Sequence, residues 1–288
     1  MYYNGHLPFY SGSLTLCSIF IALGYAVIFY EIAYCILLFF DRNMNLPIES
    51  KIKFTFIEEH PFLFSVIVIS LFWLPWVIVY YPASMDNDVF FQIDTVIGQL
   101  PPRNHHPWLS NLMISTFWRL GAAIGNQNLG IFLFILVRDT VIVCIYSFCA
   151  LFVKKSGLPK WMYLGTILFY AVTPVWDAYA KHAFKDTFGA AIFCLYILTL
   201  IVLINKVQKK EDHLYDYIAN GAGAFASLMR NNFIYCILPV TLLLIVFLMR
   251  HRVKMIKSIL LFLLLSSYFI FNYSIYHCDG AYHEYKKW

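Results

Sequence analysis

The chain has 288 residues, of which 61% are hydrophobic, 19% aromatic and only 13% charged. Soluble domains carry about 25% charged residues, so this composition excludes an ordinary water-soluble protein. The net charge of +5 does not indicate nucleic-acid binding, because most basic residues lie in short connections between apolar runs. The seven cysteines include no Cys-x-x-Cys pair and no cluster with zinc spacing, so nothing supports a disulfide framework or a structural metal.

Apolar runs long enough to cross a bilayer recur along the chain. The first follows an N-terminus that lacks the basic start of a cleaved signal peptide, so we expect a retained span. The clear runs are 13–40, 61–81, 129–153, 161–180, 187–204, 231–249 and 257–276. The sequence therefore predicts an all-α polytopic membrane protein with a single transmembrane domain, 1–288.

Two weaker segments decide the topology. Segment 108–125 is apolar but interrupted by polar residues, and the Gly- and Ala-rich segment 216–230 adjoins 231–249, with which it forms either two short spans or one bent span. Most Lys and Arg residues lie in four loops, 41–60, 154–160, 205–215 and 250–257. All four loops can face the cytoplasm, as the positive-inside rule requires, only if 108–125 does not cross and 216–230 does. We therefore predict eight spans, with an interfacial helix in the outer loop 82–128.

In this topology the remaining polar residues collect on the outer face. They are Asp86, Asp88, Gln92, Asp94, Arg103, Asn104, His105 and His106 in the first outer loop, Asp177, Lys181, His182, Lys185 and Asp186 in the next, and Arg230, Asn231 and Asn232 in the third. Such residues near a membrane face are costly unless paired or solvated, so we infer a shared polar cavity. The alternative is structural, with solvated carboxylates, helix-end ion pairs and an arginine that reaches the interface.

Arg138 and Asp139 lie inside the run 129–153, where an ionised side chain is costly unless paired. Neighbouring residues on a helix point about 100° apart, so these two need not pair with each other. Glu31 in the first run is one candidate partner for Arg138. We interpret this group as structural.

The order of several motifs resembles a known family. A span ending in YYPASMDNDVFFQ is followed by HHPWLSNLM, a long span, KKSGLPKW, FYAVTP, KHAFKDTF and LMRNN. This order resembles an uncharacterised family of bacterial multi-pass proteins that is similar to the GT-C class of membrane glycosyltransferases. The resemblance covers about residues 60–250. It implies a GT-C-like fold and transfer of a sugar from a polyprenyl-phosphate carrier to a cell-envelope acceptor at the outer face of the cell membrane.

The resemblance also implies a set of site residues. The family's Tyr-Pro-Gly-x(5)-Asp-x(3)-Gln pattern falls on Tyr81, Pro82, Ala83, Asp88 and Gln92, with Ala83 in place of the usual glycine. Its His-Pro, Lys-Asp and Arg-Asn elements fall on His106-Pro107, Lys185-Asp186 and Arg230-Asn231. Relatives usually continue with more spans or an outer domain, whereas this chain stops at Trp288, as a natural terminus or a truncated copy.

The expected chemistry follows from these residue types. Asp88, or Asp86 in its place, would take the proton of the acceptor hydroxyl, and His106 would assist. Lys185 and Arg230 would hold the departing phosphate, with Gln92, His105, Asp186 and Asn231 as further substrate-binding residues. Two carboxylates and two histidines could also hold a divalent ion, so the metal requirement stays open. The alternatives are a transporter or flippase for a lipid-linked or anionic substrate and a non-catalytic subunit of an envelope complex.

Overall fold

The computed structural model describes residues 55–100 and 107–251, together with most residues between 20 and 38. The contacts divide the chain into two units, Met1–Lys53 and Phe54–Trp288, and each is described by itself. In the first unit the described residues between 20 and 38 are helical, as expected for part of the run 13–40. The predicted run 257–276 lies outside the described residues.

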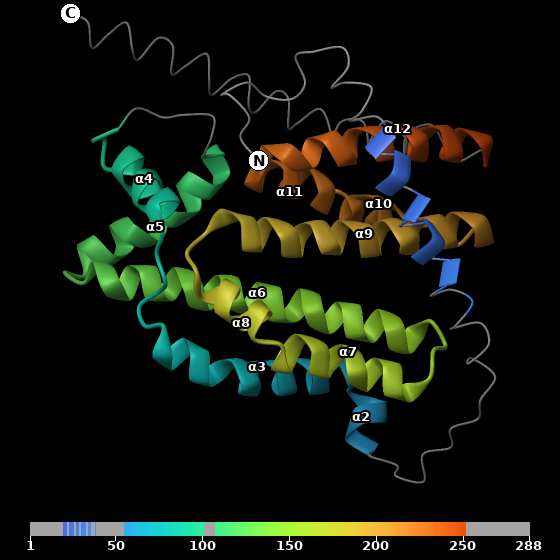
Figure 1. The fold of residues 1–288 in the computed structure, drawn as a ribbon, viewed down its shortest axis with the longest axis horizontal. Coiled ribbons are helices and arrows are strands. Elements are labelled where there is room, and N and C mark those ends of the chain that lie inside the picture. Colours follow the sequence, from blue (N-terminus) through green and yellow to red (C-terminus); the bar gives the residue numbers. More distant parts are fainter. Residues whose placement is uncertain are drawn as a thin grey trace, which may run out of the picture. The chain divides into compact units, whose positions relative to one another are not determined.

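The second unit is built from helices, and its described residues contain no strand apart from an isolated bridge between Ser84 and His182 (Figure 1). In chain order the elements are α2 (Thr55–Glu59), α3 (Pro61–Val79), α4 (Asn87–Val96), α5 (Trp108–Ala123), α6 (Gln127–Lys155), α7 (Lys160–Val172), α8 (Pro174–Lys181), α9 (Lys185–Lys209), α10 (Leu214–Asn220), α11 (Ala222–Met229), the 3-10 helix η1 (Asn231–Phe233) and α12 (Ile234–Arg250).

Four helical stretches of this unit are long and apolar enough to cross a membrane. They are Pro61–Val79, Gln127–Lys155, Lys185–Lys209 and Asn231–Arg250. Each covers one of the apolar runs recognised in the sequence, at 61–81, 129–153, 187–204 and 231–249. The prediction of an all-α membrane protein is confirmed to this extent, and the count of eight spans stays a prediction.

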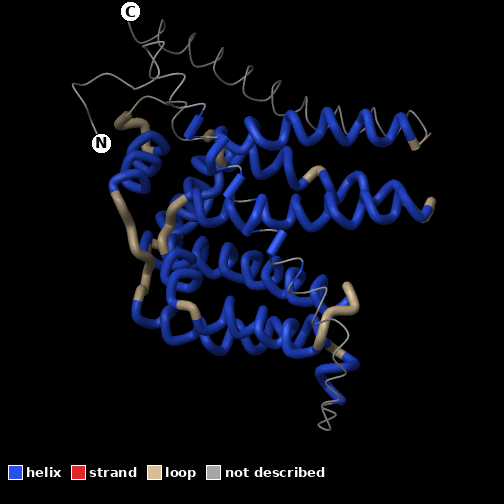
Figure 2. Tube along the Cα trace, turned by 45° about the vertical axis from the view of Figure 1, so that its right-hand side comes forward, coloured by secondary structure: helices blue, strands red, loops and turns tan. Residues whose placement is uncertain are grey.

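The remaining clear run within the described residues, 161–180, and the weaker segment 216–230 are broken helices. The run 161–180 divides into α7 and α8 at Thr173, because Pro174 has no amide hydrogen with which to continue the hydrogen-bond ladder. The segment 216–230 divides into α10 and α11 at Gly221. Figure 2 shows the helices joined by short loops.

The helices α6, α9 and α12 run in one direction, and α3, α7 and α10–α11 run in the opposite direction (Figure 1). The turns at 154–160 and 205–215 and the end of α12 therefore meet at one end of the bundle, which we call the basic end. Glu58 of α2 lies there and pairs with Lys154 (3.2 Å) and Lys160 (2.7 Å). The loops at residues 81–86, 182–184 and 230 meet at the opposite end, which carries α4 and α5.

The pair α5–α6 is a tight hairpin, and two glycines allow its close crossing. A Cβ atom at Gly130 would lie 2.3 Å from the Phe117 carbonyl oxygen, and one at Gly121 would lie 2.8 Å from the Asn126 carbonyl oxygen. The Asn126 side chain caps α6 by accepting from the Leu129 amide at 3.0 Å. Helix α5 has only 16 residues and folds back on α6, and its expected position at the membrane interface stays a prediction.

Candidate functional site

The candidate site is organised by the connection between α8 and α9, residues 182–184. The Ser84 amide donates to the Lys181 carbonyl oxygen, and the Ala183 amide donates to the Ser84 carbonyl oxygen, both at 3.0 Å. These two bonds join the loop after α3 to the loop before α9. The first and second predicted outer connections are therefore held together by main-chain hydrogen bonds.

Two ion pairs follow directly from this junction. Lys185, in the first turn of α9, places its Nζ atom 3.1 Å from Oδ2 of Asp88 in α4. Its neighbour Asp186 accepts from Nη1 of Arg230 at 2.7 Å. Arg230 precedes η1, so three connections that are distant in the sequence contribute to one charged cluster, Asp88–Lys185–Asp186–Arg230.

The members of this cluster differ in their contact with solvent. The Lys185 side chain is only 7% exposed, whereas those of Asp88 and Arg230 are 33% and 39% exposed. Each cation faces a carboxylate, so the cluster as a whole is close to neutral. A ligand can reach it from the side on which Asp88 and Arg230 are open.

Two other predicted residues have well-defined structural partners. The Asp86 carboxylate caps α4 by accepting from the Val89 amide at 3.1 Å. Gln92 is buried and donates to Ser110 Oγ (2.8 Å) and to Asn111 Oδ1 (2.9 Å), which ties α4 to the start of α5. These contacts give both Asp86 and Gln92 a structural role. The catalytic role of Asp86 and the binding role of Gln92 stay predictions.

Asn231, the seventh candidate to be placed, begins η1 directly after Arg230. His105 and His106 fall in 101–106, outside the described residues. Within the described ranges 55–100 and 107–251, no three His, Cys, Asp or Glu side chains come close enough to hold a metal ion. A site that includes the two histidines lies beyond this statement, so the metal question stays open.

A small cavity adjoins the cluster on its buried side. Its volume is about 10 Å³, and its polar lining comes from Gln92, Ser110, Arg138 and Lys185. This volume holds about one water molecule and is far below the roughly 300 Å³ at which small-molecule pockets begin. On its buried side the cluster therefore has no room for a substrate.

Arg138 clamps the junction from within α6. Its Nη1 atom donates to the Phe184 carbonyl oxygen at 3.1 Å, and Nη2 donates to the carbonyl oxygens of Ala180 (3.1 Å) and His182 (2.6 Å). The side chain is 1% exposed and lies over the Phe134 ring. Three carbonyl groups at the end of α8 are thus satisfied by one guanidinium, which fixes where Lys185 and Asp186 emerge.

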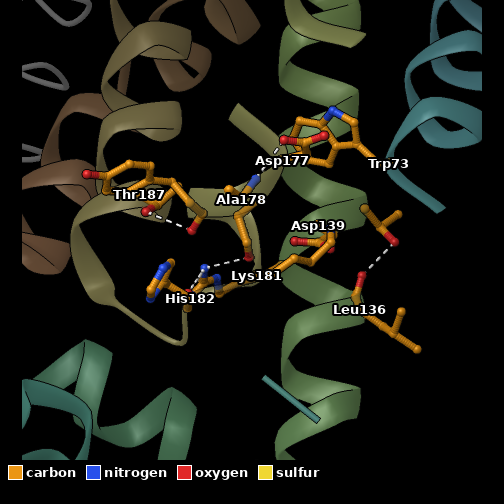
Figure 3. A network of polar contacts seen from close by, with 12 residues as sticks. Trp73, Leu136, Asp139, Asp177, Ala178, Lys181, His182 and Thr187 are labelled. Atoms are coloured by element: carbon orange, nitrogen blue, oxygen red, sulfur yellow. Dashed lines mark hydrogen bonds and ion pairs between the residues drawn. The ribbon is translucent and has the colours of Figure 1, made fainter. Parts of the chain in front are cut away.

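A buried ion pair between Lys181 and Asp139 lies beside Arg138 (Figure 3). Lys181 Nζ donates to Oδ2 of Asp139, and its ammonium group is 4.8 Å from the centre of the Trp73 ring. Asp177 is also buried and accepts a hydrogen bond from the Ala178 amide at 2.7 Å. Arg138 and Asp139 were interpreted from the sequence as structural, and these contacts give each a structural partner. A contact between Arg138 and Glu31 stays a prediction, because Glu31 belongs to the other unit.

Comparison with known proteins adds no identity. A scan against protein-family models, a search of curated proteins and a search of solved structures each found no match to this chain. The assignment of a function therefore rests on the residues and their geometry.

Sequence reasoning missed the importance of Lys181 and of the carbonyl groups around it. Lys181 was noted as an outer polar residue, but it lies inside the bundle and pairs with Asp139. The available signal was the spacing Asp177-x-x-x-Lys181, which places both side chains on one face of α8. Lys181 on that face contacts Asp139 of α6.

Proposed function

We propose that this protein is a membrane glycosyltransferase that moves a sugar from a polyprenyl-phosphate-linked donor to a cell-envelope acceptor on the outer face. The observation that carries the proposal is the charged cluster Asp88–Lys185–Asp186–Arg230 at the end of the bundle opposite the basic loops. It offers a carboxylate and two cations that could take a proton and hold a phosphate.

In this proposal Asp88 is the general base. The acceptor hydroxyl oxygen attacks the anomeric carbon, its proton passes to Asp88, and the bond between that carbon and the phosphate oxygen breaks. The leaving polyprenyl phosphate takes the bond's electron pair, and Lys185 and Arg230 stabilise its charge. Asp86, His106 and the binding residues assist as expected from the resemblance.

In this proposal a bound phosphate rearranges the ion pairs of the cluster. A phosphate that binds Lys185 competes with Asp88 for the same ammonium group, which is 3.1 Å away. Release of Asp88 would leave its carboxylate available for the acceptor hydroxyl. Donor binding and activation of the base would thus be one event.

The test is donor turnover by the full chain in proteoliposomes supplied with undecaprenyl-phosphate glucose or undecaprenyl-phosphate mannose, with release of undecaprenyl phosphate measured by mass spectrometry. Asp88→Asn should lower turnover more than 100-fold, the scale on which one preorganised catalytic group acts. Asp94→Asn, in the same helix but outside the cluster, is the matched control and should retain turnover. Full turnover by Asp88→Asn would refute the proposed base.

A transporter or flippase is the second candidate, and a specific observation favours it. The pair Asp139–Lys181 and the carboxylate of Asp177 lie buried beside the broken helix α7–α8. Interrupted helices with ionisable residues near them are common in transporters. The same vesicles separate the two functions, because a flippase moves the intact donor across the bilayer and releases no undecaprenyl phosphate.

A non-catalytic subunit of an envelope complex is the third candidate. Its expected signature was a wide separation of Asp88, Lys185 and Arg230, whereas these residues belong to one cluster. This candidate would be favoured over the first two if the vesicles showed no donor turnover and no donor movement.

A further inference from the structure

A groove at the basic end is not used by the proposed function. It has a volume of about 420 Å³, within the range of small-molecule sites. Three helices form its walls, with Leu151 and Lys155 from α6, Leu195 and Val202 from α9, and Asp216 and Ala219 from α10. The groove lies far along α6 from Arg138, so it is separate from the charged cluster.

The lining of this groove divides into an apolar wall and a charged rim. The aliphatic and aromatic side chains come from adjacent turns of α6 and α9, and the two charged residues, Lys155 and Asp216, belong to the end of α6 and the start of α10. Asp216 is already neutralised by Lys206 at 2.6 Å and caps the His213 amide at 2.9 Å. Lys155 is exposed and forms no ion pair with another described residue.

We propose that this groove binds one anionic phospholipid of the leaflet at the basic end, with an acyl chain along the apolar wall and the headgroup phosphate at Lys155. An acyl chain matches an apolar wall, and a phosphate matches an exposed ammonium that pairs with no carboxylate among the described residues. The leaflet that faces the basic loops is the one that carries anionic lipids under the positive-inside rule.

The geometry distinguishes this site from general attraction of basic loops to a membrane. Lys209 provides the comparison, because it occupies the last turn of α9 just as Lys155 occupies the last turn of α6. Both are exposed at the basic end, but only Lys155 lines the groove. A specific site therefore depends on Lys155 and is indifferent to Lys209.

The experiment is native mass spectrometry of the full chain in detergent, titrated with palmitoyl-oleoyl phosphatidylglycerol or with the zwitterionic phosphatidylcholine of the same chains. Both headgroups carry a phosphate, but the choline cation of phosphatidylcholine cancels its charge and repels Lys155. Phosphatidylglycerol, which keeps its net negative charge, should therefore bind about tenfold more tightly. Lys155→Ala should remove that preference, whereas Lys209→Ala should change it less than twofold.

A second variant tests the apolar wall. Ala219 is exposed and lines the groove, so Ala219→Phe should fill the space without disturbing the packed core and should weaken binding of both lipids at least fivefold. Ala219→Leu serves if the phenylalanine variant does not fold. Equal affinity for the two lipids, equal effects of Lys155→Ala and Lys209→Ala, or unchanged binding in the filled groove would each overturn the proposal. None of these results depends on donor turnover.

Discussion

Two sets of charges in this molecule lie close together and are held in opposite ways. In the charged cluster, Asp88 and Arg230 keep a third or more of their side chains exposed. In the buried network, Arg138 and Lys181 are each 1% exposed, and their partners are carbonyl oxygens and Asp139. A ligand from solvent can replace a partner in the charged cluster, whereas the contacts of the buried network are closed to solvent. Within the one segment 181–186, Lys181 thus belongs to the buried network, whereas Lys185 and Asp186 belong to the charged cluster.

The largest expected effect comes from breaking the buried pair. Lys181→Met leaves Asp139 without its cation inside the bundle, and removal of one partner of such a pair costs about 3–5 kcal/mol. Unfolding in sodium dodecyl sulfate, followed by circular dichroism, measures this loss. Lys185→Met removes a cation from the half-open cluster and should cost clearly less. Equal losses in the two variants would show that the division between the two sets of charges is wrong.

The next effect sharpens the role of Arg138. Arg138→Lys keeps the positive charge but cannot reach the carbonyl groups of Ala180, His182 and Phe184 together. We expect a loss of about 2 kcal/mol and faster hydrogen exchange at the Ala183 amide, whose bond to Ser84 depends on the position of this segment. Donor turnover should fall as well if the proposed function is correct. An unchanged exchange rate at Ala183 would contradict the clamp.

A smaller effect on stability is expected for Asp88→Asn. The pair with Lys185 is open on one side, and such pairs contribute about 1 kcal/mol or less. The same variant should nevertheless lose more than 100-fold in donor turnover. Unfolding and turnover measured on one preparation give both numbers. A variant that is severely destabilised would indicate that Asp88 belongs with the buried network.

The smallest effect concerns the basic end, where Lys160 and Lys154 hold the pKa of Glu58 below its ordinary value. A lowered pKa means that the stabilisation is present at neutral pH and is lost as the pH falls through the folded-state value. Glu58 is substantially exposed, so Glu58→Gln should cost only a few tenths of a kcal/mol at pH 7. The difference from wild type should vanish in acid, and a difference that grows in acid would reverse the assigned sign.

The sequence predicted the long apolar helices well, because the bilayer demands continuous runs and the chain supplies them. It also predicted that the turns 154–160 and 205–215 share an end of the bundle, since the basic residues are distributed unevenly. It did not predict the break at Thr173 or the pairing of Lys181 with Asp139, which depend on how α8 packs against α6. The partners of Arg138 could not be predicted for another reason. They are main-chain carbonyl groups, which every residue has, so residue type does not identify them.

The same absence of a sequence signal affects the pairing within the charged cluster. Asp88, Lys185, Asp186 and Arg230 were all chosen from the sequence, but nothing in it says that Lys185 meets Asp88 while Asp186 meets Arg230. That choice is made by the junction of Ser84 with Lys181 and Ala183, which sets the direction in which α9 begins. The junction itself is formed by main-chain atoms and so leaves little trace in residue type.

The contacts of Arg138 also impose an order on biosynthesis. Its carbonyl partners follow it by 42 to 46 residues, so α6 leaves the ribosome well before the groups that neutralise its polar step exist. An unpartnered arginine and aspartate in a lipid environment are costly. We therefore expect α6 to reach its final position only when residues 180–184 are available, and helices α6 to α8 to settle together.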